Sequence, residues 1–168
     1  LPYGQLTGSS SIGGRTVNAS SEGLSDPLIK AAINLYGAPA LTLDQFKNYQ
    51  QDLIVGVSLA ASVPWGKYDD NQLINVGANR WFIQPGLGVS KALGPWRLEL
   101  AGAGIFYTSN TNFMGGNSLS QNPVYSTQTH AIYYFQNTAW ISVDATYFTG
   151  GQSYVNGNPI SGSQENWR

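Results

Sequence analysis

The strongest constraint on the fold is a two-residue alternation of apolar and polar side chains in residues 80–107. Within the segment RWFIQPGLGVS, the two alternating sets are Trp81, Ile83, Leu87 and Val89 against Arg80, Phe82, Gln84 and Ser90. Successive side chains of a β-strand point to opposite faces. The alternation therefore predicts a sheet with one apolar face and one polar face.

The same alternation recurs along the chain and predicts six strands, at about residues 28–37, 52–63, 80–91, 96–108, 125–135 and 140–149. Tight turns are predicted at 92–95 and 136–139, and one helical turn in the segment GAPALTLDQFKNYQ. Long polar loops are predicted at 65–79, 109–124 and 150–164, with residues 1–24 as another long loop on the same, extracellular edge. The fold class is thus an all-β antiparallel up-and-down meander over residues 25–168, in a single domain spanning 1–168.

Charged side chains within these strands are confined to the polar face. At roughly 10 to 13 residues, the strands are longer than the usual ~5–6 and match the ~9–11 of a tilted membrane-spanning strand. We therefore expect the polar face to line a wet lumen; its predicted lining residues are Lys30, Asn34, Asp52, Arg80, Gln84, Arg97, Glu99, Gln128, His130 and Asp144. Lys91 shares the apolar parity, but it lies at a turn, from which an ammonium reaches headgroups.

Aromatic residues on the apolar face sort by height into two girdles. Trp81, Phe106, Tyr125 and Tyr147 lie near the long-loop end, and Trp96 and Tyr133 near the short-turn end. Two girdles around an uncharged band are typical of a transmembrane β-barrel whose outside contacts outer-membrane lipid. A soluble sandwich, with the apolar face as its core, remains the alternative.

Composition narrows the possible functions. Charged residues make up 10% of the 168 residues and the net charge is -1, so nothing favours a nucleic-acid partner. The absence of Cys excludes thiolate chemistry, and with a single His we expect no metal site and no cofactor. No apolar run approaches the ~18 residues of a membrane helix.

Four segments carry a family resemblance: GLSDPLIKAAINLYGAPAL, PWGKYDDNQLINVGANRWFIQPGLGVSKALGPW, QNPVYSTQTHAIYYF and AWISVDATYFTGGQSYVNG. In order and spacing, over residues 23–157, they resemble the Gram-negative family named for a MetA (meta) pathway of phenol degradation. The chain is more distantly similar to the barrel that exports amyloid subunits in pseudomonads. The resemblance implies an outer-membrane transporter of small apolar or aromatic compounds, with a homo-oligomer left open. Family members have further strands at both ends, which implies that this chain supplies about six to eight strands of a barrel of about twelve.

Two groups of residues on the polar face are candidates for a functional role. His130 and Asp144 would face each other if their hairpin centres on Asn137, with Ser126 and Ser142 nearby, which leaves a barrel hydrolase as a remote alternative. No nucleophile-elbow motif supports it, so we predict no catalytic residue.

The other group is Arg80, Arg97 and Glu99. These charges are expected to form either a constriction that selects permeants or, preferably, a cross-strand charge network. Passive passage is the favoured function, and a structural, adhesive or protein-export barrel is the main alternative.

Overall fold

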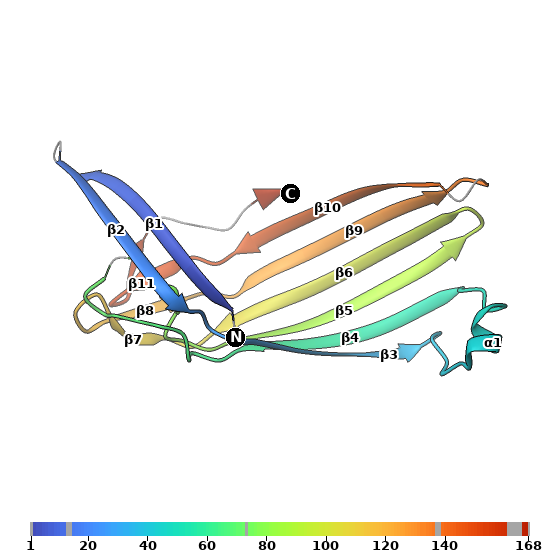
Figure 1. Cartoon of the computed structure of the whole chain (residues 1–168), viewed down its shortest axis with the longest axis horizontal. Helices are drawn as coiled ribbons and strands as arrows, with labels where there is room; N and C mark the ends of the chain where they lie inside the picture. Colours follow the sequence, from blue (N-terminus) through green and yellow to red (C-terminus); the bar gives the residue numbers. More distant parts are fainter. Residues whose placement is uncertain (1, 13–14, 73, 137–138, 161–165, 168) are drawn as a thin grey trace.

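A seven-stranded antiparallel sheet forms the body of the molecule (Figure 1). The computed structural model describes residues 2–12, 15–72, 74–136, 139–160 and 166–167. Six strands follow one another in chain order: β3 (Leu28–Tyr36), β4 (Leu53–Ser62), β5 (Phe82–Leu93), β6 (Trp96–Tyr107), β9 (Val124–Tyr134) and β10 (Trp140–Gly150). The short β13 (Asn166–Trp167) pairs with β10, and the described sheet does not close on itself. The predicted all-β meander is confirmed, with each strand boundary within two residues of its expected place.

Residues 1–24 were predicted to be a polar loop, and this prediction was wrong. They hold β1 (Tyr3–Ile12) and β2 (Arg15–Leu24), which pair along their whole length into a two-stranded ribbon. One side of the ribbon carries glycine where a strand would normally carry an apolar side chain, because another loop packs there. A Cβ added at Gly8 would meet Cδ1 of Ile74 at 2.6 Å, and one added at Gly23 would meet Cδ of Lys67 at 2.9 Å.

The long connections also contain more regular structure than expected. A second sheet, in the order β12, β11, β8, β7, is built from β7 (Asn110–Phe113), β8 (Asn117–Gln121), β11 (Ser153–Val155) and β12 (Asn158–Ile160). It lies at the same end of the main sheet as the 64–81 loop (Figure 1). The long connections are thus gathered at one end as predicted, but those at 109–124 and 150–160 are not simple loops.

The opposite end carries the short connections. A two-residue turn at Gly94 and Pro95 joins β5 to β6, with Gly94 at a φ of 58° as the first position of a type II′ turn requires. The predicted helical turn is confirmed as α1 (Leu43–Phe46), which begins with a capping box between Thr42 and Gln45. Residues 137 and 138 of the other predicted tight turn lie outside the described residues.

Two polar side chains organise the 64–81 loop. The carboxylate of Asp26, just before β3, accepts hydrogen bonds from the backbone N–H groups of Gly66 and Ala78, each at 2.7 Å. Asn110 is 1% exposed, accepts from the side chain of Asn79 at 2.9 Å and donates to the hydroxyl of Tyr68 at 2.9 Å. The loop is therefore attached both to the start of the main sheet and to β7.

The pairing registers determine which residues share a face. No bulge forms at Pro85: Ile83 pairs with Phe106 and Gly86 with Ala103, so the same register resumes beyond the two unpaired positions. Proline lacks an N–H and leaves a gap in the ladder without shifting it. A register shift occurs instead between Asn34 and Tyr36 at the end of β3, so the alternation ends before Leu35.

Candidate functional site: the polar face of the main sheet

The apolar face of the main sheet is uncovered in the described structure. Along β5 and β6 its side chains are the more exposed set, with Leu87 and Leu100 both 54% exposed, while the intervening polar-face residues are half-buried. A soluble sandwich would have placed these leucines beneath a second layer, and the described residues supply none. Of the buried hydrophobic residues, Ala60 and Val124 have the parity of the polar face, and Val63 lies just beyond the end of β4.

The polar face is hollowed. A hollow of about 390 Å³ lies on its middle, over β3, β4, β5, β6 and β9. Its floor consists of small residues in two adjacent rows. One row is Gly56, Gly88 and Ala101, and the other is Ser58, Gly86 and Ala103. Small residues in register on neighbouring strands keep large side chains out of this area, and this creates the space.

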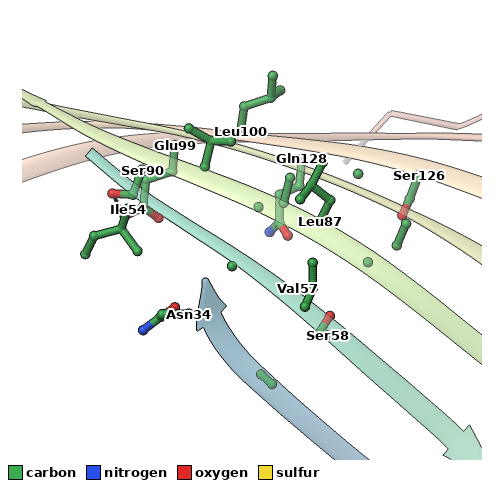
Figure 2. Close-up of a pocket in the computed structure, with 18 of the residues that line it drawn as sticks. Asn34, Ile54, Val57, Ser58, Leu87, Ser90, Glu99, Leu100, Ser126 and Gln128 are labelled. Atoms are coloured by element: carbon green, nitrogen blue, oxygen red, sulfur yellow. Dashed lines mark hydrogen bonds between the residues drawn. The ribbon is translucent and has the colours of Figure 1, made fainter. Parts of the chain in front are cut away.

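A transverse row of polar groups crosses the sheet beside this floor. Ser90, Glu99, His130 and Asp144 follow one another in register across β5, β6, β9 and β10. The Ser90 hydroxyl donates to Oε1 of Glu99 at 3.0 Å and accepts from Nε2 of Gln51 at 2.7 Å. Figure 2 shows Ser90 and Glu99 together, with Leu100 pointing away from them. We call this set the polar row.

The predicted meeting of His130 and Asp144 is confirmed. They are directly opposite each other, and Nδ1 of His130 contacts Oδ1 of Asp144. The nearby Ser142 hydroxyl donates to Oδ2 of Asp144 at 3.2 Å rather than to the imidazole. The described residues therefore form an Asp–His pair without a serine placed as a nucleophile, and they contain no cluster of metal-ligating side chains.

The predicted charge network of Arg80, Arg97 and Glu99 does not form. The ion pairs among the described residues are Lys47–Asp44, Lys91–Asp52 and His130–Asp144. The guanidinium carbon of Arg97 lies 5.5 Å from the centroid of the Tyr134 ring, and its Nη1 is 3.5 Å from the Tyr134 hydroxyl. Each arginine thus contacts a tyrosine ring on its own face of the sheet and forms no ion pair with a carboxylate of the described residues.

Arg80 lies at the loop end of the polar face. Its guanidinium carbon is 4.6 Å from the centroid of the Tyr107 ring, and its Nη2 donates to Oε1 of Gln121 at 2.6 Å. Burial lowers the pKa of Arg80 from its ordinary value, and the neighbouring Tyr107 hydroxyl opposes this shift. Sequence reasoning missed the two tyrosines; their signal is that Tyr107 and Tyr134 share the parity of the charged residues.

The other predicted lining residues divide into two groups. Lys30, Asn34, Gln84 and Gln128 border the hollow. Asp52 does not: it precedes β4, and its side chain, 78% exposed, forms an ion pair with Lys91 at the short-turn end. The alternation ends where the strand ends, so parity could not place this carboxylate.

Aromatic pairs stand at both ends of the apolar face. Phe106 and Tyr125 meet edge to face at the long-loop end with ring centroids 6.3 Å apart, and Trp96 and Tyr133 do so at the short-turn end at 4.9 Å. Phe135, which the predicted girdle omitted, adds a further edge contact to Tyr133 at 4.9 Å. Of the remaining predicted members, Trp81 is 44% exposed and Tyr147 pairs in register with Thr127.

Helices play no part in this arrangement. Within the described ranges, no helix is both long and apolar enough to cross a membrane.

Comparison with known proteins gives a family and a structural relative. An outer membrane channel from Pseudomonas putida F1, known from its crystal structure, matches with a TM-score of 0.71 at 20% sequence identity. The match covers 97% of this chain and 65% of the channel, so the chain spans less than two thirds of that protein's length. No curated protein sequence matches the chain. The family described as "Putative MetA-pathway of phenol degradation" matches residues 1–166, nearly the whole chain. The chain therefore belongs to this family, and it has the fold of an outer membrane channel.

Proposed function

We propose that the chain forms part of the wall of a passive outer-membrane channel in a Gram-negative bacterium. The polar face lines the lumen, the apolar face contacts lipid, and small apolar or aromatic molecules pass through. The channel named in the structural comparison supports this assignment through the shared fold.

The sorting of side chains between the two faces carries the proposal. Lys30, Arg97, Glu99 and Asp144 all lie on the hollowed face in the pairing registers, whereas Leu87 and Leu100 are exposed on the other. A lipid-facing Arg or Lys at mid-bilayer costs about 2–4 kcal/mol. Exposed leucines, by contrast, are favourable only where the surroundings are apolar. Lipid on one side and water on the other account for both observations.

Strand length fits the same environment. β5 and β6 each have 12 residues. At ~3.4 Å per residue and a tilt of ~45°, such a strand rises about 29 Å along the membrane normal, close to the ~30 Å of the hydrocarbon core. The aromatic pairs at its two ends then lie at the two interfaces. Lys91, on the apolar parity, stands at the short-turn end and pairs with Asp52 there, where both charges reach the headgroup region.

The hollow accounts for passage of small molecules. Its floor of glycine and alanine keeps the centre of the wall free of large side chains. The same face also presents Ile54 beside the polar groups, so the wall accommodates a weakly polar solute.

Site-directed labelling tests the proposed orientation. The chain has no cysteine, so single cysteines can be introduced at the adjacent positions 100 and 101 of β6. In the full-length protein folded into lipid vesicles, we expect a membrane-impermeant thiol reagent to modify Ala101→Cys and to spare Leu100→Cys. The reverse preference would refute the orientation. Single-channel conductance in planar bilayers tests passage itself, and a folded barrel that conducts no ions would instead favour a structural role.

A further inference from the structure

We propose that the polar row forms a binding station for a neutral, flat molecule that carries a hydroxyl or N–H donor, with Nε2 of His130 as its principal acceptor. The inference rests on the proposed function, because the ligand must reach the hollow through a lumen. It adds a specific side chain and a ligand class to that function.

The contact with Asp144 determines what His130 offers to a ligand. A carboxylate only accepts hydrogen bonds, so in a neutral imidazole the proton lies on Nδ1, the nitrogen that contacts Oδ1 of Asp144. Nε2 is then unprotonated and acts as an acceptor. His130 lines the hollow, and among the described residues no side chain donates to this nitrogen. The neutral imidazole is therefore oriented, in a defined tautomer, beside the hollow.

Glu99 adds a second acceptor in the same row. It is directly opposite His130, and its carboxylate is held by the Ser90 hydroxyl through one oxygen, Oε1. The Gln51 amide in turn holds that hydroxyl. Two acceptors on adjacent strands, each fixed by a further side chain, are preorganised for a donor that approaches from the hollow.

The floor of the hollow selects for shape. Gly88 and Ala101, a matched pair one row away from Ser90 and Glu99, present no side chain beyond a methyl group. A Cβ built on Gly88 would already touch that of Ala101 at 3.8 Å. A planar ring can therefore lie against the bare backbone while its donor reaches the polar row.

The charges around the hollow disfavour anions at the row. Glu99 and Asp144 are the carboxylates in it, and Arg97, on the adjacent row toward the short turns, is engaged with Tyr134. Lys30 borders the hollow in the row of Gln84, six residues along β5 from Ser90, which is about 20 Å at ~3.4 Å per residue. A ligand carboxylate at His130 would meet two negative charges, whereas the positive charge of Arg97 lies one row away.

Nitrogen-15 NMR on histidine-labelled, full-length protein in detergent micelles tests the proposal, because these 168 residues contain one histidine. The signal is assigned by its loss in the His130→Gln variant. At a pH at which the imidazole is neutral, we expect Nε2 to have the chemical shift of an unprotonated nitrogen. Benzyl alcohol should move this shift in a saturable manner. Benzyl methyl ether, which has the same ring without a donor, and benzoate should bind at least tenfold more weakly.

Two variants separate hydrogen-bond positioning from general structure. Asp144→Asn introduces an amide that can donate to Nδ1 and so place the proton on Nε2; it should abolish the response to benzyl alcohol. Ser142→Ala removes the other hydrogen bond to the same carboxylate and should preserve the response. A protonated Nε2 in the parent protein, or equal responses to the alcohol and the ether, would overturn the proposal.

A water-soluble paramagnetic agent distinguishes failure of the proposed binding station from failure of the proposed lumen. If it broadens the His130 signal while benzyl alcohol has no effect, the lumen exists and the binding station does not. If it fails to reach His130, the proposed lumen is itself wrong, and the station falls with it.

Discussion

The opposite environments of neighbouring residues in β6 can be tested by placing the same charge on each face. Leu100 lies on the apolar face, four positions from Trp96 and six from Phe106, so it is near the middle of the span. Ala101 lies on the floor of the hollow. Arginine at position 100 would face hydrocarbon, whereas arginine at position 101 would face water.

The expected cost follows from this depth. Leu100→Arg should lower the free energy of unfolding by about 2–4 kcal/mol. At ~1.4 kcal/mol per factor of ten, this corresponds to a roughly 30- to 700-fold change in the folding equilibrium. Ala101→Arg should change that free energy by less than about 0.5 kcal/mol, as for a solvated surface substitution. It should nevertheless reduce conductance, because the side chain enters the hollow.

The assay is reversible unfolding of the full-length protein in phosphatidylcholine vesicles, titrated with guanidinium chloride and followed by tryptophan fluorescence. Trp96 and Trp81 lie at the two ends of the apolar face and report on insertion. Equal destabilisation by the two substitutions would show that both faces have the same surroundings. A larger cost at position 101 would place lipid on the wrong side and refute the reasoning.

Three further substitutions probe the hollow, the loops and one turn. Gly88→Leu should block the hollow and lower single-channel conductance. Gly102→Leu should leave conductance unchanged, because Gly102 borders the hollow through its backbone but has the parity of the opposite face; equal effects would argue against the hollow as the path. Asn110→Ala removes a fully buried hydrogen-bonding side chain and should cost about 1–3 kcal/mol, seen as faster amide hydrogen exchange in residues 64–81; unchanged exchange would contradict its role. Gly37→Ala should lower the free energy of unfolding, measured by chemical denaturation, far more than Gly115→Ala. Both glycines have a positive φ, which costs alanine about 1–2 kcal/mol, but only at position 37 would the Cβ lie 1.6 Å from a carbonyl oxygen of β4; similar losses for the two variants would count against this clash.

The sequence predicted the main sheet well because each strand contacts two different surroundings. Side chains at Leu98 and Leu100 have to be apolar and those at Arg97 and Glu99 do not, so the alternation is visible in the residues themselves. The pairing of His130 with Asp144 followed from the same parity combined with hairpin geometry.

The ribbon of β1 and β2 could not be recognised in this way. Its packed side carries glycines at positions 4, 8 and 23, because side chains such as Ile74 fill the space from a loop that is distant in sequence. The pattern of such a strand depends on its partner and not on a solvent boundary. It was therefore indistinguishable from a polar loop.

The alternation of side chains also did not predict which side chains contact each other. Arg97 and Glu99 share a face, but the alternation does not say that the guanidinium contacts the ring of Tyr134 and forms no ion pair with Glu99. Asp52 lies one position before β4, where the face of the sheet is no longer defined, and its partner Lys91 belongs to the opposite parity. Such choices depend on reach and on local backbone direction.

The two hydrogen bonds accepted by Asp26 limit where the 64–81 loop can vary. A single carboxylate holds Gly66 and Ala78, so the two ends of the intervening segment are fixed beside the start of β3. Between these ends, the Tyr68 hydroxyl accepts from Asn110 and Ile74 packs against Gly8, so the described part of the segment has further fixed points. Substitutions at exposed positions such as Asn71 should therefore change the surface at this end of the sheet without moving β3.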